Sequence, residues 1–259
     1  MLPAEKRVAS DSEVSNVVDN IKVDIFIRSY HKDLNWLSYC LASIDKFCTG
    51  FRVVVVVPKS TWSRAQYLRD SFESIRFEQC DDYRDDYLGQ QVTKLHADFF
   101  TDADFISHVD SDCIFTRPVS PEDLIGSGKP RILMLPIAKL SRQKPWLGPT
   151  EEFLGWKVNY DFMQHPPFSY PRSLYGDLRN YSLEMHGLSL EQYVMARPPR
   201  GFSEYNVLGA YAYKWRQDQF NWLDVSLEDP GEHSCRWYWS WGGITPAIFR
   251  EIKALLSIP

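Results

Sequence analysis

Two aspartates that stand two residues apart are the side chains of this sequence best suited to chemistry. Asp110 and Asp112 lie in the run DFISHVDSDCIF, residues 104–115, between two apolar segments. If this run is a buried strand, alternate side chains point to the same side, so the two carboxylates lie together. Close carboxylates repel each other unless a cation or protons compensate. Paired oxygen ligands suit Mg²⁺ or Mn²⁺, which typically take one or two carboxylates plus substrate phosphates.

The same acidic motif has a simpler interpretation. Asp and Ser are common turn formers, so residues 110–112 also fit a solvated turn. An Asp-x-Asp motif by itself is weak evidence for a site. The flanking apolar strand favours the site, because α/β sheets bind ligands at the carboxyl ends of their strands.

The segments around the motif predict a layered α/β arrangement in the first half of the chain. Apolar runs predict strands at 23–29, 53–57, 75–77 and 131–135, and helical spacing predicts helices at 34–47, from 60 or 61 to 72, and at 88–100. Asp33 is expected to cap the first helix. The valines at 53–57 are typical of a parallel strand covered on both faces. The order β-α-β-α-β indicates a Rossmann-like half.

The second half is aromatic and less regular. Residues 139–180 are rich in Pro, Trp, Tyr and Gly and show no clear period, which is typical of a functional or mobile segment. Helices are expected at 189–195, at 203–215 and from 245 onward, with a strand at 220–225. Trp237, Trp239 and Trp241 could line one side of a sugar site, although packing on the sheet is the default for two of the three.

Composition excludes several classes of protein. The net charge of −5 does not indicate a nucleic-acid binder. The 5 cysteines include no CxxC pair, which argues against a disulfide framework or a zinc site and favours reduced thiols in a cytosolic setting. The polar start of the chain does not indicate a signal peptide, and no run of about 18 apolar residues predicts a membrane span.

Four segments give the chain a family resemblance. They are VDIFIRSY at 23–30, YLGQQVTKLHAD at 87–98, HVDSDCIF at 108–115 and FSEYNVLGAY at 202–211. Together with the layout of residues 22–250, they resemble a GT-A glycosyltransferase and are similar to a group of small bacterial and viral sugar transferases.

The resemblance implies both a fold and a domain plan. The implied fold is of the α/β, GT-A type, a Rossmann-like and mostly parallel sheet flanked by helices. Residues 1–21 would be a polar N-terminal lead-in, and 22–259 a single domain. Within that domain, 22–136 would bind the nucleotide sugar and the aromatic-rich part, 137–259, would bind the acceptor.

The resemblance also assigns the donor site. In this family the two acids of the motif hold a divalent metal, Mn²⁺ or Mg²⁺, on the diphosphate of a nucleotide sugar. Asp112 would be the direct metal ligand, and Asp110 would bind the ribose or the sugar, or reach the metal through water. The donor-binding residues would be Arg28, Ser29, Tyr30, Gln91, Lys94, Asp110, Ser111, His233 and Trp241. The alternatives are an ordinary loop for Ser29, a solvated surface side chain for Lys94 and a structural role for His233.

Glu204 is the candidate general base. An inverting transfer needs a carboxylate that takes the proton of the acceptor hydroxyl. Ser203 as helix cap would place Glu204 in the first helical turn, where the helix dipole favours the charged form. A glutamate in a first turn is also good capping on its own, so a purely structural role stays open.

The predicted function is transfer of a sugar from a nucleoside diphosphate sugar, UDP by default, to a glycan or small hydroxyl acceptor. Two alternatives remain. A nucleotidyltransferase that builds nucleotide sugars generally has a Gly-rich loop after the first strand, whereas residues 28–33 contain no Gly. A non-catalytic carbohydrate-binding protein would explain the aromatic residues but not the layered half. No nucleic-acid partner is expected, and the expected location is the bacterial cytoplasm or a virus-infected cell.

Overall fold

A five-stranded sheet lies at the centre of the computed structural model, which describes residues 21–141 and 145–257. Most of the predicted lead-in therefore lies outside the described residues. The strands follow the order β3-β2-β1-β4-β8. Their bounds are β1 Val23–Arg28, β2 Arg52–Pro58, β3 Arg76–Cys80, β4 Phe105–His108 and β8 Phe168–Pro171. The first four are parallel, and β8 runs antiparallel to β4.

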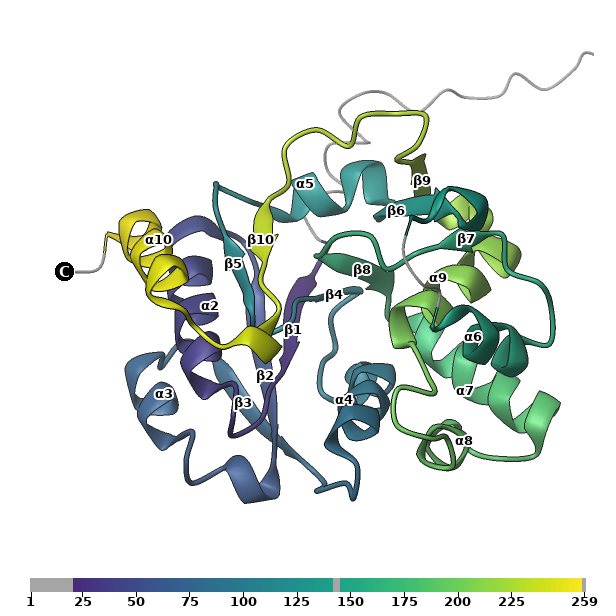
Figure 1. Cartoon of the computed structure of the whole chain (residues 1–259), viewed down its shortest axis with the longest axis horizontal. Helices are drawn as coiled ribbons and strands as arrows, with labels where there is room; N and C mark the ends of the chain where they lie inside the picture. The colour runs from purple at the N-terminus through teal and green to yellow at the C-terminus, as the bar shows by residue number, and fades with distance from the viewer. Residues whose placement is uncertain (1–20, 142–144, 258–259) are drawn as a thin grey trace, which may run out of the picture.

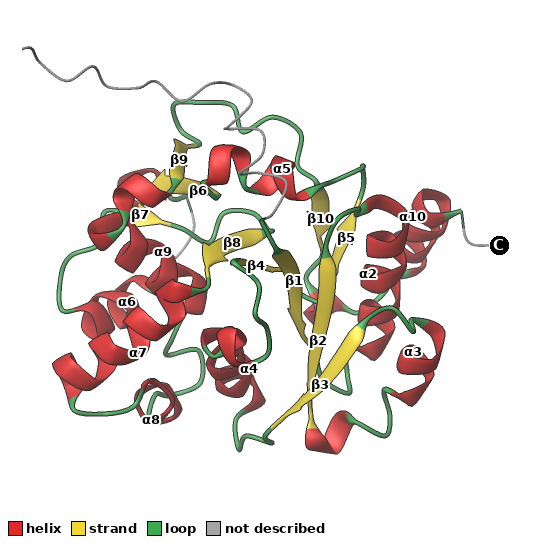
Figure 2. Ribbon diagram, turned by 180° about the vertical axis from the view of Figure 1, so that it is seen from behind, coloured by secondary structure: helices red, strands yellow, loops and turns green. Residues whose placement is uncertain are grey.

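Helices cover both faces of this sheet (Figures 1 and 2). On one side lie α2 (Leu34–Phe47), α3 (Gln66–Ser71) and α10 (Pro246–Leu256). On the other side lie α4 (Asp86–Leu95), α6 (Leu147–Leu154), α7 (Ser173–His186), α8 (Leu190–Met195) and α9 (Glu204–Trp215). The predicted fold class, a mostly parallel sheet flanked by helices, is confirmed.

Strands β1 and β2 show why helices cover both faces of the sheet. Successive side chains of a strand point to opposite faces, so an apolar run needs a core on each side. One core contains Ile25, Ile27, Val55 and Val57, and the other contains Phe26, Val54 and Val56. None of these side chains is more than 2% exposed. The valine run therefore forms a buried parallel strand, as its sequence predicts.

Two smaller sheets flank the central one. Strands β5 (Cys113–Phe115) and β10 (Cys235–Trp237) pair antiparallel, and β7 (Tyr160–Asp161), β6 (Arg131–Pro136) and β9 (Asn221–Asp224) form a three-stranded sheet. The predicted strand at 131–135 thus exists but does not join the central sheet. The remaining short helical segments are α5 Pro121–Leu124 and the 3-10 turns Lys59–Thr61, Ala97–Phe99, Gly126–Gly128, Ile137–Lys139, Gln217–Gln219 and Ser240–Gly242.

Several predicted boundaries are wrong. The helix expected to start at residue 60 or 61 starts only at Gln66, as α3, and residues Lys59–Thr61 form a 3-10 turn instead. Helix α4 begins earlier than residue 88, because the side chain of Asp85 caps it by accepting a hydrogen bond of 3.1 Å from the Leu88 amide. It also ends at Leu95 instead of continuing to residue 100.

The largest difference concerns residues 139–180. Leaving aside 142–144, which lie outside the described residues, this stretch contains α6, β7, β8 and the start of α7. Helix α7 buries Leu174, Tyr175, Leu178 and Ser182, a helical spacing that the surrounding Pro, Tyr and Gly residues concealed in the sequence. Strand β8 is four residues long, which is too short to give a periodic signal.

Two further observations concern the chain as described. Between residues 21 and 257, without 142–144, no helix is both long and apolar enough to cross a membrane. All five cysteines lie in the described ranges and are free thiols.

Candidate functional site

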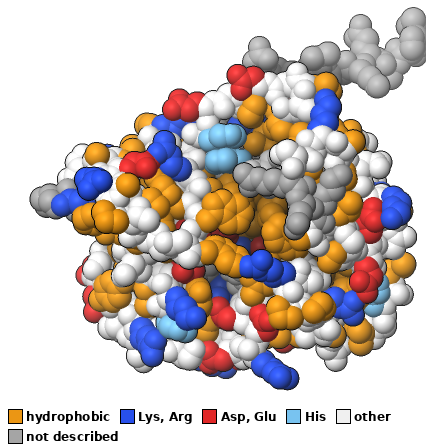
Figure 3. All heavy atoms as spheres, in the orientation of Figure 1, with side chains coloured by type: hydrophobic (Ala, Val, Ile, Leu, Met, Phe, Trp, Pro, Cys, Tyr) orange, Lys and Arg blue, Asp and Glu red, His pale blue; other side chains and the backbone are white. Residues whose placement is uncertain are grey.

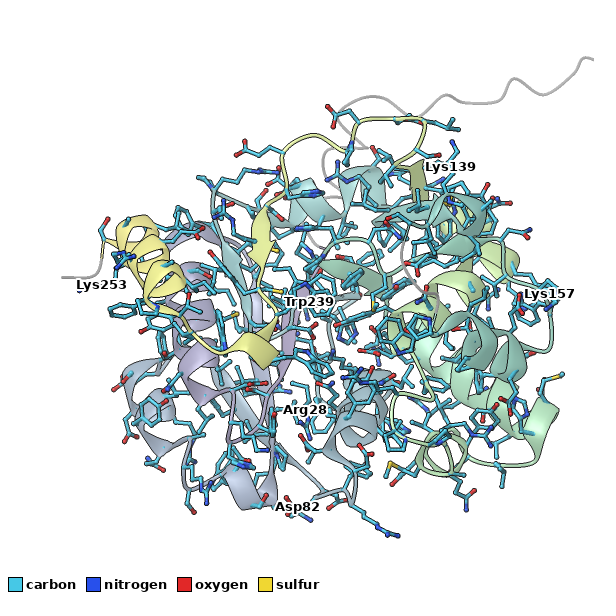
Figure 4. The ribbon with its side chains drawn as sticks, in the orientation of Figure 1. Arg28, Asp82, Lys139, Lys157, Trp239 and Lys253 are labelled. Carbon is cyan, nitrogen blue, oxygen red and sulfur yellow. The ribbon has the colours of Figure 1, made fainter. Side chains whose placement is uncertain are left out.

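A cavity of about 810 Å³ opens at the carboxyl ends of β1 and β4. The first residues of α2, α4 and α9 contribute to its wall, and the segment after β10 closes one side. Figure 4 shows two of its residues, Arg28 and Trp239, near the middle of the molecule. Its charged side chains are Asp33, Asp86, Asp110, Asp112, Glu204, Arg28, Lys32 and Lys94. Because five carboxylates face three cationic groups, we call it the acidic cavity.

The acidic motif lies in a turn, not in a strand. Strand β4 ends at His108 and β5 begins at Cys113, whose amide donates a 3.0 Å hydrogen bond to the Asp110 carbonyl. The alternation of a strand therefore does not explain why both acids reach the cavity, and that part of the sequence argument is wrong. The tight turn places Asp110, Ser111 and Asp112 on the cavity wall.

Asp112 is a buried carboxylate with one free oxygen. Its side chain is 7% exposed, and Oδ2 accepts a 2.8 Å hydrogen bond from the Ser240 amide. Oδ1 is buried and has no hydrogen-bond partner among the described residues. Burial, followed by the charge of Asp110, raises the pKa of Asp112 to about 7. A bound cation would give Oδ1 a partner and offset the cost of burying the charged carboxylate.

Lys94 joins Asp110 to Glu204. Its ammonium lies 2.6 Å from Asp110 Oδ1 and 2.8 Å from Glu204 Oε1, and the residue is 2% exposed. Burial lowers the Lys94 pKa, but the charges of the two acids outweigh burial, so the pKa is raised. The Tyr205 hydroxyl also donates to Asp110 Oδ1, at 3.2 Å. Lys94 is therefore not a solvated surface lysine, and its charge is already shared by two carboxylates.

Glu204 is the first residue of α9, as the sequence predicts. Its amide donates a 3.1 Å hydrogen bond to Gln91 Oε1 on α4, which explains why Gln91 is buried here. The expected Ser203 side-chain cap is not formed. Ser203 Oγ instead accepts a 3.2 Å hydrogen bond from Asn206 Nδ2. The position of Glu204 thus depends on Gln91 and Lys94 rather than on local capping.

Arg28 is buried and paired with an acid that the sequence did not single out. Both of its terminal nitrogens bind the carboxylate of Asp86, one of them at 2.9 Å. Such a two-bond pair fixes the guanidinium plane. Asp86 lies two residues before the helix predicted at 88–100, and only that position could have indicated its role.

Asp33 is a second acid that the sequence assigned differently. It precedes α2, but its side chain makes no capping hydrogen bond. Burial, followed by the charges of Asp110 and Asp86, raises its pKa to about 6. Asp33 therefore belongs electrostatically to the acid group of the cavity.

The remaining predicted donor residues divide into two sets. Tyr30, Ser111 and Trp241 line the acidic cavity. Ser29 does not: its amide donates a 3.1 Å hydrogen bond to the Val56 carbonyl, and its hydroxyl is buried. His233 is not brought to the acids either, since it lines a separate cavity.

The three tryptophans near the C-terminus all line the acidic cavity. Trp237 and Trp239 are stacked, with ring centroids 5.1 Å apart. Trp239 is 52% exposed and Trp241 is 65% exposed, so packing on the sheet does not account for these two. Exposed aromatic faces beside a polar cavity are typical of sites that stack on rings.

A second cavity, of about 750 Å³, adjoins the first. Trp146, Met163, Trp237 and Trp239 line both. In its wall the rings of His165 and His233 are parallel, with centroids 3.7 Å apart. Figure 3 shows hydrophobic side chains gathered in the hollow at the centre of this face, with histidine side chains above them.

The acids of the cavity offer ligands for a shared metal site rather than a complete one. In the described ranges, no three or more His, Cys, Asp or Glu side chains are arranged to hold a metal ion. Asp110 and Asp112 supply two carboxylates, and Mg²⁺ typically takes one or two from a protein when substrate phosphates supply further ligands. The unpartnered Asp112 oxygen fits this kind of shared site.

Comparison with known proteins gives a family match and several similar structures. The model of the family described as "Family of unknown function (DUF6492)" matches residues 15–240. No curated protein matches the chain.

Among solved structures, S. aureus TarS 1-349 in complex with UDP is 15% identical with a TM-score of 0.49; the match covers 92% of this chain and 65% of that one. The glycosyltransferase GlyE of Streptococcus pneumoniae is 11% identical with a TM-score of 0.44, covering 93% of this chain and 52% of that one. For 4-diphosphocytidyl-2C-methyl-D-erythritol synthase the identity is 14% and the TM-score 0.47, covering 91% and 99%. The chain thus spans less than two thirds of the length of the first two.

Proposed function

The chain belongs to the family of unknown function DUF6492, and we propose its activity from the residues of the acidic cavity. The proposed function is a metal-dependent, inverting glycosyltransferase of the GT-A type that uses a nucleoside diphosphate sugar, with UDP taken from the motif resemblance. The observation that carries the proposal is the free buried oxygen of Asp112 beside Asp110, in a cavity of about 810 Å³. That volume is within the range of small-molecule sites.

Asp110 and Asp112 would hold the metal, Mn²⁺ or Mg²⁺, together with the donor phosphates. When bound, the ion stabilises the negative charge on the departing diphosphate. Arg28 would lie beside the donor with its guanidinium fixed by Asp86. Tyr30 and Trp241 offer ring faces on which a nucleobase or a sugar can stack.

Glu204 would take the proton in the transfer step. The acceptor hydroxyl oxygen forms a bond to the anomeric carbon of the donor sugar, and the bond from that carbon to the diphosphate oxygen breaks. The hydroxyl proton passes to the Glu204 carboxylate, and the nucleoside diphosphate leaves with the bonding electrons. Lys94, which contacts both Glu204 and Asp110, positions the base relative to the metal acids.

Calorimetric titration of UDP, with and without Mn²⁺, tests the donor site. We expect binding that requires the metal and that is lost in Asp112→Asn. The matched control is Asp45→Asn, an exposed acid outside the cavity, which should bind like the wild type. Metal-independent binding of sugars without nucleotide would contradict the proposal, as would a preference for nucleoside triphosphates over UDP.

The Glu204→Gln variant tests the base. Gln keeps the shape of the side chain but cannot accept the proton, so turnover should fall by about 10²–10⁴-fold. Slow hydrolysis of the donor by water should fall as well. UDP affinity in the presence of Mn²⁺ should change little, because Glu204 faces the acceptor. Normal turnover together with a lower melting temperature would assign Glu204 a structural role instead.

A further inference from the structure

The second cavity contains polar groups that the acidic cavity does not use. Thr150 is 1% exposed and lines this cavity, and its hydroxyl has no hydrogen-bond partner among the described residues. The indole N–H of Trp146, which borders both cavities, makes no hydrogen bond of standard geometry among the described residues, although the Tyr87 hydroxyl lies beside it. A buried donor without a partner costs stability, and a bound water, ion or ligand atom can remove that cost.

The rest of the wall combines aliphatic and polar side chains. The aliphatic residues of the cavity are Leu135, Ile137, Leu140, Leu147, Val158 and Met163. Asp161, one of its few charged residues, has Oδ1 occupied by hydrogen bonds from the Met163 amide at 3.0 Å and from Gln164 at 2.8 Å. Glu232 and Arg236 also border the cavity, so it has three charged residues where the acidic cavity has eight, and its aliphatic side chains offer a hydrocarbon surface beside them.

The histidine pair adds no charge to this wall at neutral pH. Burial lowers the pKa of His165 to about 4, and burial lowers the pKa of His233 as well. His165 Nδ1 lies 2.7 Å from the Pro166 carbonyl, so this nitrogen carries the proton of the neutral ring. Two stacked neutral rings form a flat surface that suits an uncharged ligand.

Helix α9 connects the two cavities to the proposed chemistry. Ser203 and Glu204 line the acidic cavity, and Asn206, in the same helical turn, lines the second. The two cavities also share the wall formed by Trp146, Met163, Trp237 and Trp239. A molecule held in the second cavity can therefore present one end, past this shared wall, to the acidic cavity that Glu204 lines.

We propose that the second cavity binds the acceptor, and that this acceptor is an amphiphile: a hydroxyl-bearing molecule whose hydrocarbon or aromatic portion occupies the aliphatic and histidine-lined wall. Thr150 and Trp146 donate hydrogen bonds to its oxygen atoms. The inference rests on the proposed function, since it names the acceptor class of that enzyme.

Three β-glucosides with the same sugar test the class of acceptor. Methyl, octyl and phenyl β-glucoside, each below any micellar concentration, are titrated calorimetrically into the full chain. We expect the octyl or the phenyl compound to bind at least about tenfold more tightly than the methyl compound, because its larger apolar group leaves water when it packs against the cavity wall. The better of the two identifies a hydrocarbon or an aromatic group. Equal affinities would overturn the proposal.

Two leucine substitutions locate the binding. Leu147→Trp puts a larger side chain into the second cavity, whereas Leu183→Trp makes the same change at an exposed position, 53% accessible, on α7. We expect octyl or phenyl glucoside binding to weaken by at least about tenfold in the first variant and to stay normal in the second. Unchanged binding in Leu147→Trp would overturn the assignment.

Thr150→Val provides a variant that should fold without difficulty. It keeps the shape of the side chain and removes a buried hydroxyl without a partner, so the melting temperature should not fall. Glucoside affinity should drop by about three- to tenfold, the effect of one hydrogen bond. Normal affinity would remove Thr150 from the site.

UDP titration in Mn²⁺ separates the two proposals. In Leu147→Trp and Thr150→Val, UDP binding should be unchanged. If the wild type binds the glucosides in the second cavity but never binds UDP, the glycosyltransferase proposal fails while the amphiphile site stands. If UDP binds and the glucosides do not, only the acceptor assignment fails.

Discussion

At the scale of single residues, Asp110 and Asp112 are only two positions apart but have different partners. Asp110 has Lys94 and Tyr205 as partners for one oxygen, so its charge is compensated inside the protein. Asp112 has one backbone amide and one buried free oxygen. The difference explains why Asp112 is the acid that lacks a counterion and why we propose it as the direct metal ligand.

The raised pKa of Asp112 predicts a dependence of stability on pH. Without metal, the folded protein holds a proton on Asp112 up to a pKa of about 7, whereas the ordinary value is 3.8. Between these values the folded state binds more protons than the unfolded state, so the free energy of unfolding falls as pH rises. Asp33, with a pKa raised to about 6, contributes in the same direction.

The measurement is the melting temperature of chelator-treated protein at pH 6 and pH 8. Wild type should melt lower at pH 8, and Asp112→Asn should lose part of this difference and melt above the wild type at pH 8. Asp45→Asn serves as the control for a changed surface charge, and it should follow the wild type. Adding Mn²⁺ at pH 8 should stabilise the wild type but not Asp112→Asn. A pH response identical in both proteins would show that Asp112 is ionised in the apo fold.

At the scale of elements, α9 positions the site through close packing. It carries Glu204 at its start, and its residues through Ala212 are buried. Gly209 faces Phe162, and a Cβ atom at this position would overlap the Cβ and ring atoms of that phenylalanine. The glycine therefore allows the helix to approach the β7 segment closely, and residues of both α9 and β7 line the second cavity.

Substitution of Gly209 by alanine should destabilise the protein. Alanine is the better helix former, but the overlap with Phe162 forces a shift that costs about 1–3 kcal/mol. Gly176→Ala, at the fourth residue of α7, is the matched control, because its Cβ would meet only the end of the Arg179 side chain, at 3.9 Å. The free energy of unfolding of that control should rise by about 0.5–1 kcal/mol. Urea unfolding of both variants decides; a gain in both would show that α9 has room to move.

At the scale of the whole molecule, elements from the second half of the chain pack against elements from the first half. Strand β8 adds to β4, β10 pairs with β5, and α7 packs against the turn after α4. In the last contact, Arg179 binds Asp98 with two hydrogen bonds of 2.7 and 2.6 Å, and its guanidinium lies 4.2 Å from the Phe99 ring centroid. These contacts join the second half of the chain to the first.

Breaking this pair should destabilise the fold much more than breaking a surface pair. The side chains of Arg179 and Asp98 are 20% and 10% exposed, so Asp98→Ala leaves a largely buried charge without its partner. We expect a loss approaching about 3–5 kcal/mol in the free energy of unfolding. Lys157→Ala breaks a pair whose lysine is 89% exposed and should change it by less than about 1 kcal/mol. Equal losses in urea titrations would contradict this argument.

The sequence by itself determined the elements whose pattern is local. The bounds of β1, β2, α2 and α9 follow from runs or spacings of apolar residues, and the buried acids stand out because they interrupt such runs. These features require only the period of a strand or a helix and the need to cover an apolar face. The mostly parallel sheet flanked by helices follows from the alternation of those elements.

The tertiary structure alone decided which charges meet and which cavity each side chain faces. Lys94 and Glu204 are 110 positions apart, and Arg28 and Asp86 are 58 apart, so no local pattern pairs them. For the same reason, no local pattern places His233 against His165 in the second cavity. Strand β8 pairs with β4 although about 60 residues separate them in the sequence. Periodicity shows that a side chain is buried, whereas its partner depends on how distant elements pack.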